Sequence, residues 1–334
     1  MATQDKEIEK ILVTGATGFL GRHLIMQLLA QQYQVLALVR NASSRSHGLP
    51  SEVEVVEGDI SDVVLLESVI AQVEVVIHTA AMVSFWKKDA DRIMKVNGEG
   101  TANVVEACKD AGIRLIHVSS IAALGSVPKG AFVTEDTEWL PGEKRSAYAK
   151  SKYLAEREVI RGIAEGLVAQ LVNPSVIIGP THNWQEGTGK MFSIVDKGLS
   201  FYNPGSNGFV GVEDVARAII LVLQHDELEN GAQFLLNAEN LSFRELFTHI
   251  AISLGKKPPS RKLPRWPTML VATISEWLSL ISNKAPIVTR ESMKSGFYSR
   301  KFDGSKIESL GLAYTPIKEV IAKAASVYRE SFPS

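Results

Sequence analysis

Residues 11–21 read ILVTGATGFLG, an apolar run that leads into three glycines spaced three apart, Gly15, Gly18 and Gly21. The apolar run predicts a β-strand and the residues after it a helix, so the glycines fall at the turn between them. A pyrophosphate can rest on a helix N-terminus only where no Cβ covers the backbone N–H groups, and Gly15 and Gly18 remove that obstacle. Gly21 lets the helix pack closely on the strand. The stretch predicts a dinucleotide site, with a tight turn that binds no ligand as the alternative.

Apolar, β-rich runs alternate with segments of helical period through the first half of the chain. Strands are predicted at 11–14, 35–40, 53–57, 75–78, 115–119 and 168–172, and helices at 23–31, 63–72, 93–109 and 148–163. Such alternation specifies parallel strands joined by right-handed helical crossovers. We therefore expect an α/β fold with a doubly wound parallel sheet of the Rossmann type and a smaller C-terminal substrate lobe.

The alternation of predicted strands and helices ends after Pro174, where the chain becomes rich in loops. Within the second half, 209–225 and 234–237 look like a helix and a strand that return to the main sheet. A chain of 334 residues also exceeds the usual size of a single core. We expect a dinucleotide-binding domain of residues 1–176 plus 209–237, and a substrate lobe of residues 177–208 plus 238–334.

Composition excludes several classes of protein. The 36 basic and 37 acidic residues nearly cancel, and no run of like charge suggests a partner nucleic acid. The lone Cys108 favours a reducing compartment, and residues 1–10 hold no apolar leader, so a cytoplasmic protein is expected. The apolar stretch 266–281 carries Glu276 and falls short of the roughly 20 residues needed to span a membrane. It predicts a buried or cap-forming helix, with a membrane-surface helix as the alternative.

The second predicted strand ends at Arg40, where a fold that prefers NAD would place a carboxylate against the ribose 2′-hydroxyl. No carboxylate occurs from 31 to 51, and an arginine suits a 2′-phosphate through charge-assisted hydrogen bonds, with Ser43, Ser44 or Arg45 in the same loop. We therefore predict NADP as the cofactor and keep NAD as the alternative. A solvated strand-end arginine without a ligand would also fit the pattern.

Further cofactor contacts are expected where the third and fourth strands end. Asp59 is placed to accept a hydrogen bond from the adenine amino group, unless it caps a helix, a role that Asp62 could fill. After His78, small residues let a cofactor lie against the backbone: Thr79, Ala80 and Ala81. We interpret His78 as a strand-end histidine with satisfied hydrogen bonds, and because it has no second ligand at metal spacing we predict no metal site.

The catalytic signal lies in residues 145–153, RSAYAKSKY. Tyr148 and Lys152 are four apart, so on a helix both project from one face. At about 4 Å and an effective dielectric of about 20, their attraction is worth roughly 4 kcal/mol, which would lower the pKa of the phenol by about 3, to near 7. A surface helix with an inert pair is the alternative. Ser120, after the fifth strand, can donate to the oxygen that gains charge on hydride transfer, and Ser119 is its rival. Asn97, beside two glycines, could link Lys152 to solvent.

These motifs occur in order over about the first 220 residues and resemble the extended short-chain dehydrogenase/reductase family. Within it the chain is most similar to the dihydroflavonol 4-reductase-related branch, which also contains NAD-dependent epimerases. The resemblance implies that Tyr148 is the general acid or base, that Lys152 lowers its pKa and binds the nicotinamide ribose, that Ser120 orients the carbonyl and that Asn97 completes a proton relay. The residues then expected at the cofactor are Gly15, Thr17, Gly18, Phe19, Leu20, Arg40, Asp59, Ile60, Thr79, Ala80, Ala81, Ser119, Tyr148, Lys152, Pro174, Ser175 and Val176.

Departures from the family pattern narrow the reaction. Ser120 is followed by Ile121 and Ala122 rather than by the acidic pair of the sugar-nucleotide dehydratases, so dehydration is disfavoured. No arginine stands just before GVEDVA at 211–216, where epimerases hold a substrate diphosphate. The expected substrate-binding residues are Val83, Phe85, Ser120, Tyr148, His182 and Met191. Further apolar candidates, any of which could be core, are Trp86, Trp139, Trp184 and Phe201.

The sequence thus predicts an NADPH-dependent reductase that delivers hydride to a ketone or aldehyde of a medium-sized, largely apolar substrate. The alternative is an NAD-dependent epimerase or dehydrogenase of nucleotide sugars. A catalytically silent NADP sensor is disfavoured by the intact Tyr148 and Lys152. The resemblance also implies a homodimer, through the helices that contain 103–109 and 148–163.

Overall fold

The computed structural model describes residues 10–41, 48–140, 142–143, 145–282, 286 and 289–332, with a seven-stranded parallel sheet at the centre. The strands follow the spatial order β11-β7-β5-β4-β1-β2-β3. Their bounds are β1 (Lys10–Thr14), β2 (Gln34–Val39), β3 (Glu54–Glu57), β4 (Val75–His78), β5 (Arg114–Val118), β7 (Ala169–Pro174) and β11 (Gln233–Leu236). Every residue of the central strands β4 and β7 is buried because helices cover both faces of the sheet. The predicted doubly wound sheet is confirmed.

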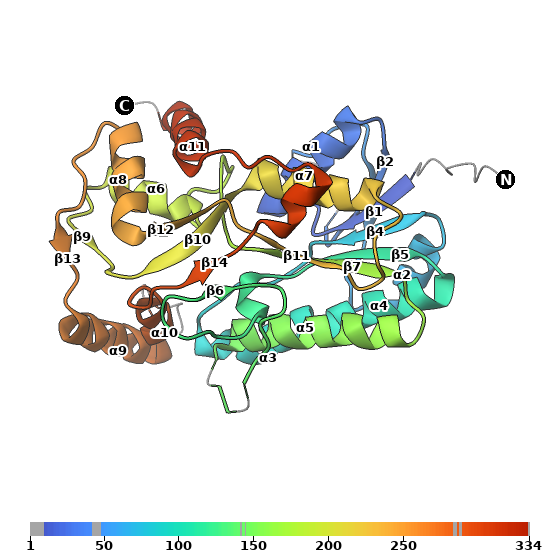
Figure 1. The fold of residues 1–334 in the computed structure, drawn as a ribbon, viewed down its shortest axis with the longest axis horizontal. Helices are drawn as coiled ribbons and strands as arrows, with labels where there is room; N and C mark the ends of the chain where they lie inside the picture. The colour runs from blue at the N-terminus through green and yellow to red at the C-terminus, as the bar shows by residue number, and fades with distance from the viewer. Residues whose placement is uncertain are drawn as a thin grey trace.

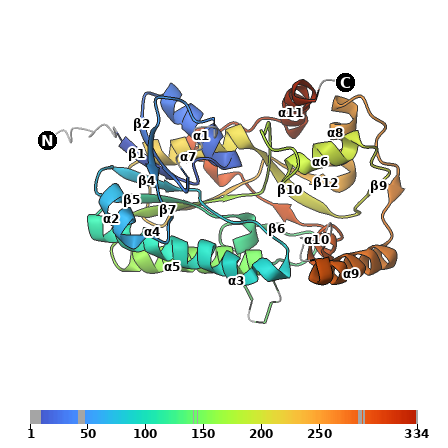
Figure 2. The same ribbon diagram turned by 180° about the vertical axis from the view of Figure 1, so that it is seen from behind.

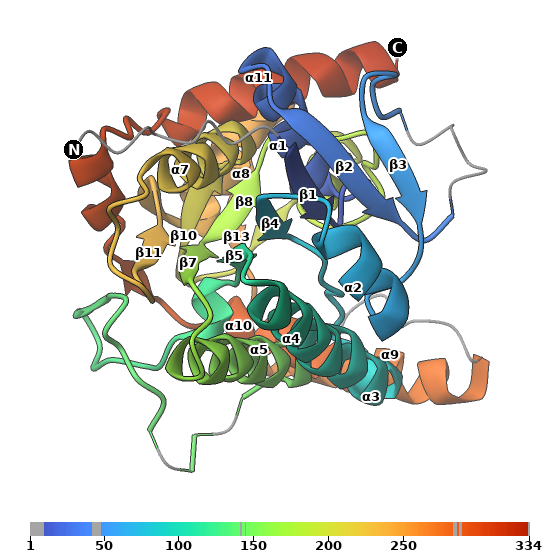
Figure 3. The same cartoon turned by 90° about the vertical axis from the view of Figure 1, so that its right-hand side faces the viewer.

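Two layers of helices enclose this sheet (Figure 3). On one face lie α1 (Phe19–Ala30) and α7 (Val212–Gln224), which share a core with β1 and β4. On the other lie α2 (Val63–Ile70), α4 (Gly100–Ala111) and α5 (Ala147–Ala164). Since all seven strands are parallel, the residues that follow them gather at one carboxyl edge, which is where this kind of sheet binds ligands.

The stretch predicted as one helix at 93–109 has three parts. The 3₁₀ turn η2 (Lys87–Asp89) leads into α3 (Ala90–Ile93), a π-helical segment η3 (Met94–Glu99) follows, and α4 begins at Gly100. A Cβ on Gly100 would lie 2.5 Å from Cδ1 of Ile60, so a larger residue there would require the Ile60 side chain to shift. A π turn re-aims the side chains around it, and here it buries Asn97.

The second lobe is built on a three-stranded sheet of β8 (Val176–Ile178), β10 (Ser206–Gly211) and β12 (Glu239–Ser242). Three helices flank that sheet: α6 (Gly189–Asp196), α8 (Phe243–Ser253) and α11 (Ile317–Ser331). Figures 1 and 2 show this lobe beside the large sheet from opposite sides. Short pairings complete it, of β9 (Phe201–Tyr202) with β13 (Arg261–Lys262) and of β6 (Phe132–Val133) with β14 (Lys301–Phe302).

The two lobes are joined again after residue 238. The 3₁₀ turn η5 (Lys306–Leu310) places Ile307 in the same core as α1 and α7, and Leu312 follows it there. Phe302 of β14 packs with Ile121 of the 3₁₀ turn η4 (Ile121–Ala123). These contacts cross the predicted boundary between the dinucleotide-binding domain and the substrate lobe. The domain boundaries therefore remain a prediction.

The apolar stretch 266–281 lies within α9 (Arg265–Ser282), which packs beside α10 (Arg290–Ser295) at the outer edge of the molecule (Figures 1 and 2). Its large side chains are not buried: Trp266 is 75% and Trp277 is 61% exposed. The expectation of a buried helix is wrong, because the small residues Ala272 and Ser279 are the ones that face the protein. Among the described residues no helix has the length and apolar character needed to cross a membrane.

Candidate cofactor and catalytic site

The turn between β1 and α1 is an open cradle of backbone. Gly15 has a φ of +70°, and a Cβ there would lie 2.7 Å from the backbone nitrogen of Ala80. A Cβ on Gly21 would lie 2.3 Å from the carbonyl oxygen of Gly15, so the helix can pack this closely only with glycine. Gly18 precedes α1 without a side-chain cap, and the first turn carries no acidic residue. The unscreened N–H groups of a 12-residue helix fit a pyrophosphate.

Buried hydrogen bonds fix the strand end beside this cradle. Thr14 Oγ1 lies 2.7 Å from His78 Nδ1, and His78 Nε2 lies 3.1 Å from Thr101 Oγ1. Burial, with a further contribution from the charge of Lys152, lowers the pKa of His78 to about 3. His78 is thus a neutral histidine with both ring nitrogens satisfied, as predicted. The Thr79 hydroxyl donates to the Thr14 carbonyl at 2.7 Å, which holds the start of the 79–81 segment against β1.

The ends of β2 and β3 carry the residues predicted for the adenosine half. Arg40 and Asp59 are both exposed there, and Asp62, not Asp59, caps α2 by accepting from Leu65 N at 3.1 Å. Burial raises the pKa of Asp59, but hydrogen bonds from Ser61 and the charges of Arg40 and Lys95 outweigh it, so the pKa is lowered. Arg40 therefore lies within electrostatic reach of Asp59. Ser43, Ser44 and Arg45 lie outside the described residues.

The remaining residues predicted at the cofactor fall along the same edge. The Thr17 carbonyl accepts from Arg22 Nε at 3.1 Å, Leu20 packs on the core, and Ile60 is buried beneath Gly100. Phe19 stands edge-on to His23, which contacts the Pro180 carbonyl at 2.9 Å and so ties α1 to the loop after β8. Three residues link the two sheets at this point: Pro174, Ser175 and Val176.

Tyr148 is the second residue of α5, whose N-cap Ser146 accepts from Ala149 N at 2.8 Å. The Ser120 hydroxyl hydrogen-bonds the phenol, and the ring of Phe85 lies 6.3 Å from that of Tyr148 between centroids. Residues from three separate segments, the loop after β4, the end of β5 and the start of α5, therefore meet at one point. Ser119 lies just behind them, 7% exposed.

The predicted lowering of the Tyr148 pKa is wrong in this arrangement. Burial raises the pKa of Tyr148, and the hydrogen bond from Ser120 offsets only part of this. Lys152 makes no contribution because its Nζ turns to the strand end and donates to the Val118 carbonyl at 2.8 Å. Burial lowers the pKa of Lys152 itself to about 8, although Glu156 acts in the opposite direction.

Glu156 was missed by the sequence analysis. It lies one turn beyond Lys152 and is buried, and the side chain of Asn173 donates both to it and to the Ser120 carbonyl, the latter at 3.1 Å. Burial raises the pKa of Glu156, while Ser119, Asn173 and Lys152 counteract that rise. Glu156 is thus the counter-charge of Lys152 and is linked to Ser120 through Asn173. Its four-residue spacing from Lys152 was the available signal.

Asn97 hydrogen-bonds both the backbone N–H and the carbonyl of Met82, in the chain after β4. Its Oδ1 accepts from Met82 N at 2.7 Å, and its Nδ2 donates to Met82 O at 2.9 Å and to Ser151 Oγ at 2.9 Å. Ser151 in turn donates to the Tyr148 carbonyl at 2.8 Å. Within the described part of the chain, Asn97 makes no hydrogen bond to Lys152 and contacts instead Ser151, the residue before Lys152 in sequence. The proton relay therefore stays a prediction.

A second pair that sequence reasoning missed is formed by two arginines. Arg145 and Arg300 donate to Ser126 Oγ at 2.8 and 3.3 Å, and Arg145 also pairs with Glu143 at 2.8 Å. Burial and the neighbouring Arg145 lower the pKa of Arg300, and Glu143 partly restores it. Two guanidinium groups thus share the Ser126 hydroxyl, and Glu143 forms an ion pair with Arg145. The two arginines are too far apart in sequence for any local pattern to pair them.

The predicted substrate residues are only partly assembled. Phe85 meets Tyr148, whereas Val83 and His182 are exposed and Met191 packs against the core of the second lobe. Trp184 belongs to that core, at 3% exposure, and is not a pocket residue. The other apolar candidates lie as follows: Trp139 stacks on Tyr153 at 4.4 Å, Trp86 lies beneath Lys88, and Phe201 is on β9.

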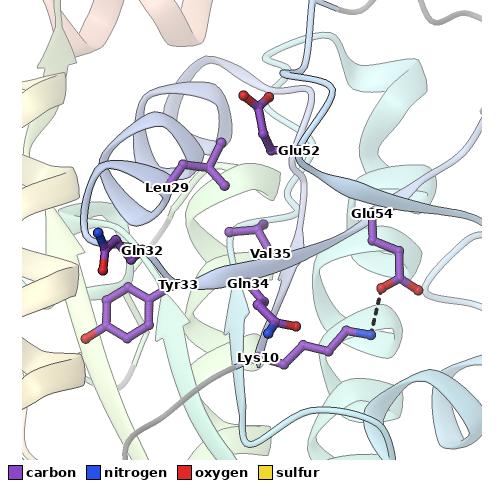
Figure 4. Close-up of a pocket in the computed structure, with 8 residues that line it drawn as sticks. All are labelled: Lys10, Leu29, Gln32, Tyr33, Gln34, Val35, Glu52 and Glu54. Carbon is purple, nitrogen blue, oxygen red and sulfur yellow. Dashed lines mark ion pairs between the residues drawn. The ribbon is translucent and has the colours of Figure 1, made fainter.

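A surface hollow of about 480 Å³ lies at the opposite end of the sheet, where β1 to β3 begin (Figure 4). Its polar lining includes the Lys10–Glu54 ion pair, at 2.7 Å. Being at the amino ends of the strands, it is remote from the glycine cradle and plays no part in the candidate site. The lining residues are Lys10, Leu29, Gln32, Tyr33, Gln34, Val35, Glu52 and Glu54.

Comparison with known proteins agrees with this geometry. Residues 11–236 match the model of the NAD dependent epimerase/dehydratase family. The chain is 33% identical to a "Putative dihydroflavonol 4-reductase" of Synechocystis sp., over 93% of this chain and 92% of that one. It is 28% identical to sterol demethylase protein B of Methylococcus capsulatus, over 96% and 98%. The crystal structure of gox2253 superposes with a TM-score of 0.82 at 32% identity, over 97% and 99%.

Proposed function

Because this chain belongs to the NAD dependent epimerase/dehydratase family and is an NAD(P)-dependent oxidoreductase of the extended short-chain type, we propose that it reduces a carbonyl group on a largely apolar substrate with NADPH. The meeting of Ser120, Tyr148 and Phe85 at the carboxyl edge of the sheet, beside the glycine cradle, carries the proposal. The names of the two relatives, a dihydroflavonol reductase and a sterol-processing protein, support an apolar ring compound as substrate.

The bound NADPH supplies the hydride. The bare N-terminus of α1 and the Gly15 turn would hold its pyrophosphate, and Arg40 its 2′-phosphate. Ser120 donates a hydrogen bond to the substrate oxygen, and Tyr148 transfers its proton to that oxygen. The raised pKa of Tyr148 keeps the phenol protonated at neutral pH, as a proton donor in the direction of reduction must be. Lys152, with a pKa of about 8, stays charged and would bind the nicotinamide ribose.

The decisive test is steady-state NADPH oxidation with a panel of apolar ketones and aldehydes. Tyr148→Phe should lower kcat by about 100-fold or more, since general acid catalysis is typically worth that much. The matched control is Tyr153→Phe, whose ring should stay stacked on Trp139. Equal rates for Tyr148→Phe and wild type would overturn the proposal.

Cofactor preference is tested separately by fluorescence titration with NADPH and NADH. Arg40 and Lys95 provide positive charge near Asp59, which supports NADPH. Arg40→Ser should weaken NADPH binding about 10-fold and leave NADH binding unchanged. A wild-type protein that prefers NADH would contradict the choice of NADP and leave NAD as the cofactor.

A second candidate is an NAD-dependent epimerase or dehydrogenase of nucleotide sugars. It is favoured by one observation: Arg145 and Arg300 approach the same hydroxyl, and among the described residues the one ion pair there is that of Arg145 with Glu143, so a diphosphate would complete the charge balance. Purified protein that carries tightly bound NAD, interconverts nucleotide sugars and loses that activity in Arg300→Gln would favour this candidate over the reductase.

Two finer proposals concern the state of the protein. We keep a homodimer through α4 and α5, on whose surface Ile160 is 43% exposed. We also keep a reducing, cytoplasmic setting, with which the fully buried Cys108 thiol is consistent; burial raises the pKa of that thiol well above its usual range. Equilibrium sedimentation tests the first, and localisation of a tagged chain the second.

A further inference from the structure

The helix α9 turns its apolar side to solvent and its polar side toward the protein. At 100° per residue, six large apolar side chains fall within an arc of about 140°, and all six are 49–75% exposed. The opposite side of the helix, which faces the body of the protein, carries the small Ala272 and Ser279 and the charged Glu276. The outward residues, called the α9 face below, are Trp266, Leu270, Val271, Ile274, Trp277 and Leu278.

Polar contacts hold α9 in this orientation. Glu276 accepts from the backbone nitrogen and the Nε of Arg290, at 2.7 and 2.9 Å, and lies 3.8 Å from Lys87. The charged side of the helix is therefore the anchored side. A surface helix normally buries its apolar face, and a contiguous exposed patch that holds two tryptophans marks a docking surface.

The segment that leads into α9 is strongly basic. Residues 256–275 contain five basic residues and no acidic one, although the whole chain has a net charge of −1. Lys256 pairs with Asp196 at 3.0 Å. The other four are exposed and have no ion-pair partner among the residues that the structure describes: Lys257, Arg261, Lys262 and Arg265.

Through its anchored side, α9 also contacts the loop that reaches the candidate site. This loop, 79–89, begins at the cofactor edge, places Phe85 against Tyr148, and ends with Lys87 beside Glu276 of α9. Val83 in the same loop is 62% exposed. Apolar side chains are therefore exposed both on α9 and on the loop that joins it to the reacting groups.

We propose that the α9 face and the basic segment 256–265 dock on an anionic lipid bilayer, with α9 lying in the interface plane. Tryptophan and aliphatic side chains on one face, with lysine and arginine beside them, are what such a surface binds. A second copy of this chain is a poorer occupant, because its α9 face would offer only apolar side chains and no negative charge to the basic segment. The docking does not depend on the reaction proposed above.

Co-sedimentation of the full chain with vesicles tests the proposal. The wild type should pellet with phosphatidylcholine vesicles that contain phosphatidylglycerol, and much less with phosphatidylcholine alone. Trp266→Ser with Trp277→Ser should weaken binding at least about 10-fold, and Lys262→Glu with Arg265→Glu more strongly still, since each basic residue is worth about 5-fold near an anionic surface.

Matched controls are Met26→Ser with Val64→Ser, which removes exposed apolar surface from α1 and α2, and Lys318→Glu on α11. These should bind vesicles like the wild type. Thermal melting and NADPH titration show that every variant is folded. Wild type that stays in the supernatant, or α9 variants that pellet like the controls, would overturn the proposal. So would an α9-dependent dimer in sedimentation without binding to vesicles.

Discussion

Replacement of Glu156 by glutamine probes the buried charge pair that lies beneath the catalytic residues. Glutamine keeps the shape of the side chain and an oxygen for Asn173 but removes the negative charge that raises the pKa of Lys152. Side chains one turn apart lie about 6 Å from each other, and at an effective dielectric of about 20 the attraction is about 3 kcal/mol. The pKa of Lys152, about 8 in the wild type, should therefore fall by about a further 2.

The consequence is measurable without a substrate. At pH 7 the charged fraction of Lys152 would drop from about nine tenths to about one tenth, so NADPH should bind up to about 10-fold more weakly. Fluorescence titration over a range of pH reports the midpoint at which affinity is lost. This midpoint should move to lower pH in Glu156→Gln and stay in place in Glu158→Gln, which alters an exposed ion pair with Arg161 on the same helix.

An unchanged midpoint in Glu156→Gln would refute the reasoning. It would mean that Glu156 is protonated in the folded protein, so that the penalty of burial exceeds the stabilisation that Lys152, Asn173 and Ser119 provide. A loss of NADPH binding that is the same at every pH would instead assign Glu156 a purely structural role. Circular dichroism on the same samples separates either result from unfolding.

Three further predictions concern stability and the cradle. The pKa of Lys152 is about 8 in the folded protein and 10.5 when unfolded, so Lys152→Met should raise the free energy of unfolding by up to about 3 kcal/mol at pH 7. This advantage should fade as the pH rises from 8 to 10.5. Denaturant unfolding would show no such trend if Lys152 were solvated. The pKa of His78 falls from 6.5 to about 3 on folding, so stability should be lost as the pH drops through that interval, by at most about 5 kcal/mol, and His78→Gln should flatten the dependence. Gly21→Ala should abolish NADPH binding and lower Tm because its Cβ meets Gly15 O at 2.3 Å, whereas Gly98→Ala, with open space around it, should leave binding intact; equal effects would contradict the packing argument.

The sequence was informative where function depends on local pattern. The glycine turn, the alternating elements and the pair Tyr148 and Lys152 are each encoded within a few residues, and the carboxyl edge of a parallel sheet brings them together. The π turn at Asn97 was not visible, because a helical period continues through it.

Other features depend on contacts between distant parts of the chain. Arg300 meets Arg145 only because β14 pairs with β6. The pKa of Tyr148 was mispredicted because spacing gives a shared helix face but not the direction of an ammonium group, which here is taken by the Val118 carbonyl. The α9 stretch was recognised as apolar, yet its composition could not tell which side would be anchored by Arg290.

The two hydrogen bonds between Asn97 and the backbone of Met82 divide the loop after β4 into halves with different freedom to evolve. The inner half, 79–82, is fastened to α5 through Ser151, so it cannot move without the helix that carries Tyr148. The outer half, 83–89, lies beyond that fastening. Apart from Phe85, whose ring meets that of Tyr148, residues there can change what the enzyme recognises without disturbing how its proton donor is held, which would let one scaffold acquire new specificities at little cost to turnover.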